Sequence, residues 1–187
     1  LVNNLQYSLP FIIKDLILKS NSEKSQFKKV IDLGCGTGLA GKDLRDISIN
    51  LIGIDISENM VSEAEKLDIY DTLIVGDIVE KLNLFPDKFD LFVALDVLIY
   101  IGDVQSIFKA VHMSCKPDSL FVFSVEIQDE NGYSLLKSSR YAHSDEYIMD
   151  QTKGLFDLVN SQNVRLRKEG ENWIEGKVYV FHPVKLG

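Results

Sequence analysis

The sequence predicts an α/β fold, a three-layer α/β/α sandwich around a mostly parallel sheet of seven strands. Short apolar segments typical of strands alternate with helical segments from residue 29 to residue 125, and the links between them are short. This alternation is typical of a parallel sheet with right-handed crossovers and helices on both faces. Two further strands, 164–168 and 177–182, follow each other near the end of the chain and predict an antiparallel C-terminal hairpin.

The single elements are predicted from their composition and their caps. Pro10 lies in the first turn of an apolar helix at 8–18, where its missing N–H costs nothing. Ser57 is a suitable N-cap for a helix at 58–67. The segment 89–95 is nearly all apolar, which indicates a strand buried on both faces. The other predicted elements are strands at 29–33, 50–54, 73–75 and 120–125, helices at 39–47, 104–114 and 144–161, a turn at 116–118 and an irregular polar segment at 129–143.

The composition is that of one ordinary globular domain. The chain has 187 residues, of which 45% are hydrophobic and 26% charged, and it shows no internal repeat and no convincing linker. We therefore expect a single domain over 1–187, with an N-terminal helical cap at 1–28 and the core at 29–187. The chain begins with Leu1 instead of methionine, which indicates either a cloned piece or the ordered part of something longer.

Charge and cysteine content argue against several function classes. The formal net charge is −8, whereas nucleic-acid binders normally carry a basic face, so we expect no nucleic-acid partner. The one dense basic stretch, Arg165-Leu166-Arg167-Lys168, alternates like an exposed strand edge. Cys35 and Cys115 offer neither a disulfide framework nor a metal-ligand spacing, so we expect no metal and a cytoplasmic location. No apolar run approaches about 20 residues and no signal peptide is visible, so we expect no membrane association.

A glycine-rich turn follows the first predicted strand. The run from Val30 to Gly38 leads from apolar residues through Asp32 to glycines at 34, 36 and 38. Glycine permits positive φ and has no Cβ to hold a ligand away, so we expect this turn to lie against a ligand. Asp32 places a negative charge where a phosphate binder would want none. The combination therefore indicates a nucleoside ligand that carries positive charge.

Aspartates stand at the ends of four successive predicted strands. An aspartate after a strand is most often a cap or turn former, but the carboxyl ends of parallel strands meet at one edge of the sheet, where ligands bind. Four such residues favour a site there: Asp32, Asp55, Asp77 and Asp96. Asp55 falls 17 residues after Gly38, at a position where a carboxylate can accept hydrogen bonds from both hydroxyls of a ribose.

The glycine-rich segment resembles a known family signature. Asp32-Leu33-Gly34-Cys35-Gly36-Thr37-Gly38 matches in full the pattern (D/E)-x-G-x-G-x-G of class I S-adenosylmethionine-dependent methyltransferases. The segment 89–98 is similar to the family's fourth strand and the residues after it. Tyr100-Ile101-Gly102-Asp103 and Ile69-Tyr70-Asp71 resemble a subgroup of small-molecule-type methyltransferases, some of which carry tetratricopeptide repeats upstream. The similarity runs from about Leu5 to His182.

This resemblance implies a Rossmann-like core that binds S-adenosyl-L-methionine and releases S-adenosyl-L-homocysteine. The three glycines would bring the backbone close to the methionine part, with Asp32 near its cationic end, either in contact with it or orienting the turn. Asp77 would accept a hydrogen bond from the adenine amine, and the Ile78 amide would donate to a ring nitrogen. The cofactor-binding residues that the resemblance implies are Asp32, Gly34, Cys35, Gly36, Gly38, Asp55, Ile56, Met60, Gly76, Asp77, Ile78, Leu95, Asp96 and Tyr7.

The reaction that the resemblance implies is a direct displacement, in which the acceptor attacks the sulfonium methyl group in line and positioning supplies much of the rate. We expect a small-molecule acceptor, with a protein side chain as the second choice. His143 is the candidate base, and Tyr100, Tyr141 and Tyr7 are candidate walls of the acceptor pocket. Two alternatives stay open, His143 as a surface or capping residue and Tyr100 as a core residue. The segment 129–143 is either an acceptor lid or a plain loop.

Other acceptors and functions fit the sequence less well. Enzymes that methylate base amino groups resemble one another in an (N/D/S)-P-P-(Y/F) turn, and Leu95-Asp96-Val97-Leu98 has no proline. A nicotinamide dehydrogenase would explain G-x-G-x-x-G at 36–41, but it leaves the preceding Asp32 and the Gly76-Asp77 turn unexplained. A binding module that keeps the cofactor site without transfer activity is compatible with these residues.

Overall fold

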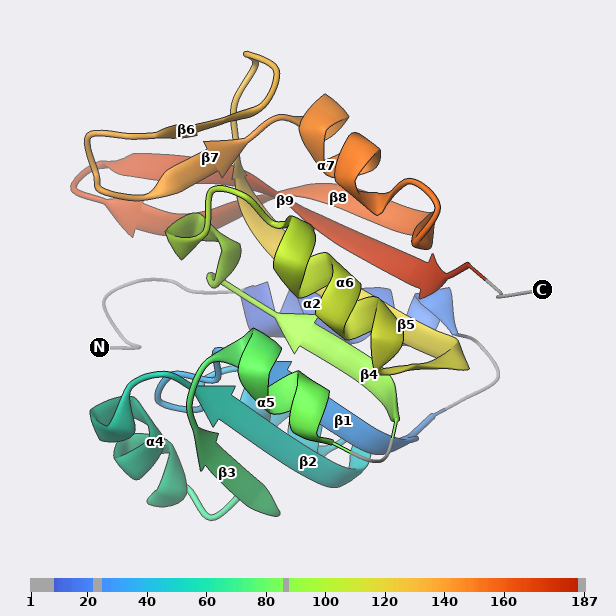
Figure 1. Cartoon of the computed structure of the whole chain (residues 1–187). Helices are drawn as coiled ribbons and strands as arrows, with labels where there is room; N and C mark the ends of the chain where they lie inside the picture. The colour runs from blue at the N-terminus through green and yellow to red at the C-terminus, as the bar shows by residue number, and fades with distance from the viewer. Residues whose placement is uncertain (1–8, 22–24, 86–87, 185–187) are drawn as a thin grey trace.

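A computed structural model describes residues 9–21, 25–85 and 88–184 of the chain (Figure 1). The described strands are β1 Phe27–Leu33, β2 Ser48–Asp55, β3 Thr72–Val75, β4 Phe89–Ala94, β5 Cys115–Ile127, β6 Tyr133–Leu135, β7 Tyr141–His143, β8 Phe156–Glu169 and β9 Asn172–Pro183. The described helices are α2 Leu9–Ser20, α3 Gly41–Arg45, α4 Glu58–Glu65, α5 Ile78–Leu84, α6 Gln105–Met113 and α7 Asp145–Thr152, with a 3₁₀ turn, η1, at Leu98–Tyr100.

The sheet is mostly parallel, as predicted. Its order is β3-β2-β1-β4-β5-β7-β6, and β9 pairs with both β5 and β8. β1 to β5 pair in parallel, whereas β8 and β9 form the predicted antiparallel pair at the C-terminal end. The strand order reverses between β1 and β4, and in Figure 1 the arrowheads of β2 and β4 point to the left of the view. Ligands bind in such sheets outside the carboxyl ends, at this switch point.

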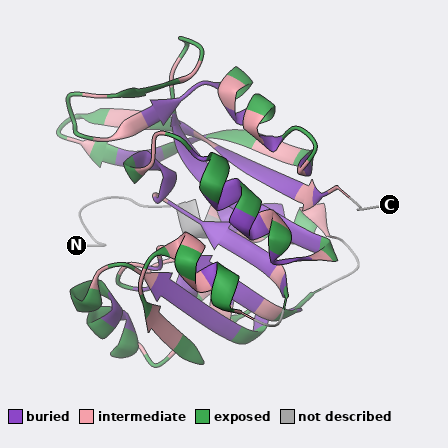
Figure 2. Cartoon of the chain, viewed as in Figure 1, coloured by how far each residue is buried: buried purple, intermediate pink, exposed green. Residues whose placement is uncertain are grey.

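Helices cover both faces of the sheet and complete the three layers. α2 and α3 bury Ile17 and Leu44 on one face. α5, α6 and α7 pack on the other, where Phe108 and Ile148 belong to a second cluster. Successive residues of β4 enter opposite clusters, which explains why this strand is nearly all apolar and buried (Figure 2). The prediction of a strand buried on both faces is confirmed.

The structure contains three elements that the sequence pattern does not predict. β6 and β7 form a short antiparallel hairpin within 129–143, and β7 also pairs in parallel with the end of β5. α5 follows β3, with Asp77 as its N-cap. The described part of the sheet therefore has nine strands instead of seven. β7 is held by its pairing with β5 and β6 by its pairing with β7, and periodicity alone cannot reveal such partners.

Several predicted boundaries are wrong. The helix predicted at 144–161 ends at Thr152, because Gly154, with φ +77°, turns the chain into β8. From Phe156 onward the chain pairs with β9 along most of the length of β9, so this pairing overrides the local helical propensity. β5 begins at Cys115, and the turn predicted at 116–118 is an irregularity in its pairing with β4.

Candidate functional site

The glycine turn lies at the carboxyl end of β1 and is fixed to β2. The N–H groups of Gly34 and Cys35 both donate to the Ile54 carbonyl, at 2.7 and 2.9 Å. Gly34, Gly36 and Gly38 have φ values of +69°, +53° and +84°, a region that side chains other than glycine rarely adopt. The predicted positive-φ turn is confirmed.

The three glycines of the turn have different neighbours. A Cβ at Gly34 would collide with the side chain of Val97, and one at Gly38 would lie 2.8 Å from Leu67 Cδ1. A Cβ at Gly36 would meet no atom within 4 Å. Open space therefore lies beside Gly36, whereas the missing side chains of Gly34 and Gly38 let Val97 and Leu67 pack closely against the turn.

Asp55 is held between the glycine turn and the start of α4. Its Oδ2 accepts from the Gly36 N–H at 2.9 Å, and its Oδ1 accepts from the Ser57 N–H at 2.8 Å. A carboxylate oxygen can accept more than one hydrogen bond, so this half-buried group can also accept from the hydroxyls of a ligand. The expected position of Asp55 beside the turn is observed, at the end of β2.

Asp32 lies beneath the turn and is 2% exposed. Its Oδ2 accepts a hydrogen bond of 2.7 Å from the hydroxyl of Tyr70. Burial raises the pKa of Asp32 to about 6, the hydrogen bond from Tyr70 opposes this rise, and the nearby charge of Asp55 adds to it. Of the two roles expected for Asp32, this burial favours orienting the turn over direct contact with a ligand.

The third strand ends in a helix cap. Oδ1 of Asp77 accepts from the Glu80 N–H at 3.0 Å, so the exposed Asp77 caps α5. The Gly76 N–H donates to the Asp55 carbonyl at 2.9 Å, which places this turn beside the end of β2. Ile56 and Met60 follow Asp55 and are 75% and 44% exposed. They give this part of the edge an apolar surface.

A group of charged side chains, of which Arg167 and Glu126 are buried, lies at the ends of β4, β5 and β8. Arg167 Nη2 donates to Glu126 Oε2 at 2.6 Å, and its Nε donates to Glu169 Oε1 at 3.1 Å. Arg167 Nη1 is 3.8 Å from Asp96 Oδ1. Asp96 has φ +55°, and its N–H donates to Ser124 Oγ at 3.0 Å. This conformation is rare for a residue other than glycine, and it is held by contacts from two neighbouring strands.

Of this group sequence reasoning singled out only Asp96; it missed Glu126 and Glu169 and misplaced Arg167. The expectation of an exposed strand edge at 165–168 is wrong for Arg167, which is 9% exposed. The register of β8 against β9 shifts between Arg165 and Arg167, so Leu166 and Arg167 are both buried. A bulge of this kind breaks the alternation on which the expectation rests.

His143 lies at the end of β7 and is 0% exposed. Its Nε2 is 2.9 Å from the Ile101 carbonyl and 3.0 Å from the Gly102 carbonyl, so Nε2 carries the proton and donates. Burial lowers the pKa of His143. Its Nδ1 is buried and has no hydrogen-bond partner in the described part of the chain. The surface alternative is therefore wrong, and these contacts favour a role in positioning 98–103 over proton transfer to a ligand.

The remaining candidates are spread between edge and core. Tyr100 is 66% exposed at the end of η1, so its alternative as a core residue is wrong. Tyr141 is half-buried against Tyr133. Cys35 and Leu95 are buried, and burial raises the pKa of the Cys35 thiol. Tyr7 lies outside the described residues.

Comparisons with known proteins identify the fold. Residues 31–123 match the family described as methyltransferase domain. The solved structure of an S-adenosylmethionine-dependent methyltransferase from Clostridium acetobutylicum superposes with a TM-score of 0.71 at 22% identity, over 92% of this chain and 89% of that one. Residues 31–123 therefore resemble a methyltransferase domain, and the chain has the fold of an S-adenosylmethionine-dependent methyltransferase.

Other methyltransferases show how widely this domain recurs. The N-methyltransferase NodS from Bradyrhizobium japonicum, solved with S-adenosyl-L-homocysteine, superposes with a TM-score of 0.71 at 15% identity, over 94% of this chain and 87% of that one. A ubiquinone biosynthesis O-methyltransferase from Actinobacillus pleuropneumoniae is 26% identical over 117 residues, which cover 58% of this chain and 50% of the relative. The chain spans about half of the length of the first relatives that it matches in sequence.

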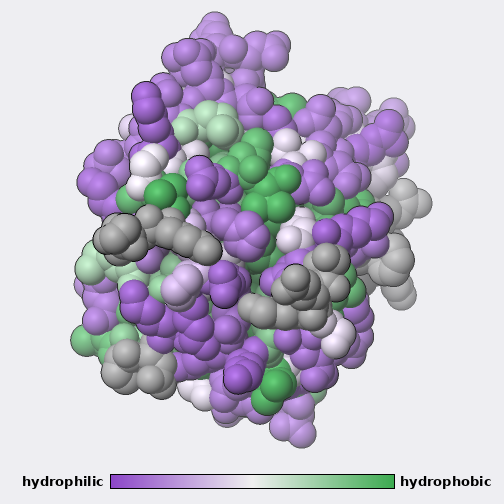
Figure 3. Space-filling model, turned by 90° about the vertical axis from the view of Figure 1, so that its right-hand side faces the viewer, coloured by the Kyte–Doolittle hydropathy of each residue, from purple (hydrophilic) through white to green (hydrophobic). Residues whose placement is uncertain are grey.

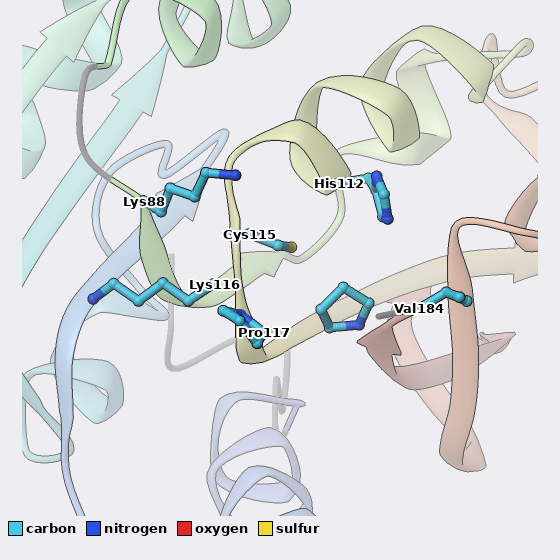
Figure 4. A pocket seen from close by; sticks show the side chains of 7 residues that line it. Lys88, His112, Cys115, Lys116, Pro117 and Val184 are labelled. Atoms are coloured by element: carbon cyan, nitrogen blue, oxygen red, sulfur yellow. The ribbon is translucent and has the colours of Figure 1, made fainter. Parts of the chain in front are cut away.

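The protein also has a cavity away from the carboxyl edge of the sheet. A cavity of about 430 Å³ lies near the amino ends of β4 and β5, lined by Lys88, His112, Cys115, Lys116, Pro117, Pro183 and Val184 (Figure 4). Hydrophobic residues form a band through the largely hydrophilic surface on the side seen in Figure 3.

Among the described residues, no group of three or more His, Cys, Asp or Glu side chains could hold a metal ion. No described helix is both long and apolar enough to cross a membrane.

Proposed function

We propose that this methyltransferase domain binds S-adenosylmethionine at the carboxyl edge and transfers its methyl group to a small-molecule acceptor. The observation that carries the proposal is the junction of the glycine turn with Asp55. The Gly36 N–H fixes the Asp55 carboxylate, and the space beside Gly36 is open. A main-chain segment that a ligand can approach closely thus lies beside a fixed carboxylate that can accept hydrogen bonds from a ribose diol.

The residues on the side of β1 to β3 fit the cofactor, and we call the glycine turn with Asp55 and Asp77 the donor side. The turn would hold the methionine part and Asp55 the ribose. Ile56 and Met60 would cover the adenine. The Ile78 amide is the first of α5 and has no partner within the helix, so it can donate to the ring. When bound, S-adenosylmethionine supplies a methyl group on a positively charged sulfur.

The acceptor would lie on the side of β4, β5 and β8, and we call Asp96, Tyr100, Glu126 and Arg167 the acceptor side. Arg167 holds Asp96, whose side chain is 26% exposed, at the end of β4. Asp96 is therefore a better-placed proton acceptor than the enclosed His143. Tyr100 would form an exposed wall of the acceptor pocket, and His143 would hold the segment that carries it.

The choice of a small molecule is supported by the ubiquinone biosynthesis O-methyltransferase among the relatives. Several sequence-based predictions stay predictions beside it: the single domain over 1–187, the individual site residues, the cytoplasmic location, the absence of nucleic-acid partners, and repeats upstream in a longer protein.

Two measurements test this function. Isothermal titration of the chain with S-adenosylhomocysteine is expected to show saturable binding, which Asp55→Ala should weaken by about 100-fold because hydrogen bonds to a charged group are lost. Asp118→Ala, at an exposed position of the β5 irregularity, is the matched control and should bind as the parent does. A screen with methyl-labelled cofactor against small-molecule extracts then tests transfer.

The rival functions give different results in the same experiments. Saturable binding of NAD with none of S-adenosylhomocysteine would overturn the proposal. Binding of S-adenosylhomocysteine without turnover on any acceptor would favour a binding module. Full affinity of Asp55→Ala would show that the ribose assignment is wrong.

A further inference from the structure

We propose that Tyr70 is a positioning residue of the cofactor site, which fixes the glycine turn and keeps Asp32 ionised beneath it, where the charge of Asp32 attracts the cationic end of the cofactor without direct contact. This inference rests on the proposed function for its ligand. The hydrogen bond from Tyr70 to Asp32 and the packing of the Tyr70 ring, which support the inference, are present in the protein without cofactor.

The first support is the packing of the Tyr70 ring against glycines. A Cβ at Gly38 would lie 3.2 Å from Tyr70 Cε2, and one at Gly53 would lie 3.0 Å from Tyr70 Cε1. A Cβ at Gly41 would collide with the Tyr70 hydroxyl. The ring therefore fills a space that three glycines from the turn, α3 and β2 leave open. Gly41, the last glycine of the G-x-G-x-x-G pattern, makes room for a tyrosine.

The second support is that the segment carrying Tyr70 is fixed on both sides. Arg45 Nη1 donates to the Ile69 carbonyl at 3.2 Å and to Asp71 Oδ2 at 2.6 Å. The Leu51 N–H donates to Asp71 Oδ2 at 2.7 Å, and the Asp71 N–H donates to the Leu51 carbonyl at 2.9 Å. Tyr70 is thus held between two anchored neighbours, so its ring has a defined position under the turn.

The third support is the surroundings of Asp32. From β2 the Asp55 carboxylate faces it, from the turn the Cys35 thiol lies near, and from the segment before β3 Tyr70 donates at 2.7 Å. The register neighbours of Asp32 on β2 and β4 are Gly53 and Val93, which carry no charge. Of these groups, the Tyr70 hydroxyl is the one that stabilises ionised Asp32 by a hydrogen bond.

The consequence is a pH-dependent affinity for the cofactor. Burial raises the pKa of Asp32 to about 6. A ligand with an ammonium or sulfonium group favours ionised Asp32, so its affinity rises as the pH rises through this value. Between pH 5.5 and pH 7.5 the ionised fraction grows about fourfold, and the affinity should grow with it. Without the Tyr70 hydroxyl the pKa of Asp32 rises further, and the midpoint moves to higher pH.

The experiment is titration of the chain with S-adenosylhomocysteine between pH 5.5 and pH 8.5, for the parent, Tyr70→Phe and Tyr179→Phe. Loss of one hydrogen bond to a charged group corresponds to about one pH unit in the midpoint, so Tyr70→Phe should bind about threefold more weakly at pH 6.5. At pH 8.5 the two affinities should coincide. Tyr179 is the matched control. It also donates to an aspartate, Asp145 Oδ1 at 2.6 Å, but it lies in β9 and not beside the glycine turn. Tyr179→Phe should keep the parent profile.

A merely structural role for Tyr70 would weaken binding equally at every pH, and this result would overturn the proposal. So would a profile of Tyr70→Phe that coincides with that of the parent. Asp32→Asn is the second variant, whose affinity should no longer depend on pH and should no longer respond to Tyr70→Phe.

Failure of the proposed function is recognised separately. If the parent binds no S-adenosylhomocysteine at any pH, the proposed function fails. The pH dependence of urea unfolding in the cofactor-free protein then still measures the effect of Tyr70 on Asp32. A Tyr70→Phe profile equal to that of the parent in this measurement would overturn the coupling itself.

Discussion

The donor side and the acceptor side of the same edge are built in different ways. On the donor side main-chain amides fix the site: the N–H groups of Gly36 and Ser57 hold the Asp55 carboxylate. The acceptor side is instead fixed by side chains from three strands, where Arg167 pairs with Asp96, Glu126 and Glu169. A site built from backbone requires glycines at set positions and leaves a sequence signature. A site built from long side chains requires only that strands meet.

The largest effect is expected on the acceptor side, from Arg167→Leu. Glu126 is 6% exposed, and removal of the guanidinium would leave its charge buried without compensation. We expect the free energy of unfolding, measured with urea, to fall by about 3–5 kcal/mol. This result would show that the acceptor side depends on charge pairing.

Two further variants sharpen this result. Glu126→Gln combined with Arg167→Leu removes both charges and should be less destabilised than Arg167→Leu alone. Arg165→Leu is the matched control, because its side chain is 65% exposed, and it should change stability by less than about 1 kcal/mol. Equal losses for Arg165→Leu and Arg167→Leu would refute the prediction.

On the donor side, Asp32 should make the cofactor-free protein less stable as the pH rises. Its pKa is raised from 3.8 to about 6, so the folded state binds the proton more tightly than the unfolded state does. This contribution is complete below about pH 4 and is lost as the pH rises through 6, with a total of about 3 kcal/mol. Urea unfolding at several pH values measures it, and Asp32→Asn should abolish it.

His143, beside the acceptor side, should act with the opposite sign. Burial lowers its pKa below 6.5, so its contribution is present at higher pH and is lost as the pH falls below that value. His143→Gln keeps a donor for the Ile101 and Gly102 carbonyls but cannot be protonated, and it should remove this slope. If both variants changed the pH profile in the same direction, the assigned protonation states would be wrong.

A smaller effect should separate two glycines of the turn. Gly34→Ala places a methyl group against Val97 at φ +69° and should cost about 1–3 kcal/mol of unfolding free energy. Gly36→Ala meets no neighbour and should cost about 1 kcal/mol, but it should weaken S-adenosylhomocysteine binding more than Gly34→Ala does. The reverse order in the binding assay would contradict the placement of the cofactor beside Gly36.

The smallest effect on stability is expected for Tyr100→Ala. The side chain is 66% exposed, so the free energy of unfolding should change by less than about 0.5 kcal/mol. Affinity for S-adenosylhomocysteine should stay that of the parent, while KM for an acceptor found in the screen should rise. A loss of cofactor affinity without a change in KM would place Tyr100 on the donor side instead.

The sequence was informative where residue type is dictated by local geometry. The positive φ values at Gly34, Gly36 and Gly38 require glycine, and the position of Asp55 follows from the end of β2. It was uninformative where a partner decides the structure. β7 depends on pairing with β5 and β6 on pairing with β7, and α5 was missed although Asp77 caps it.

By itself the sequence determined the mostly parallel sheet, the glycine turn and its family, because strand periodicity and positive φ are local properties of the chain. The tertiary structure alone decided that Arg167 is buried beside Asp96, that Nε2 of His143 faces main-chain carbonyls, and that Tyr70 lies against Gly38 of the turn and donates to Asp32. These contacts join residues 32 to 71 positions apart. The energy of such contacts depends on distance and burial in the folded chain, which no local pattern encodes.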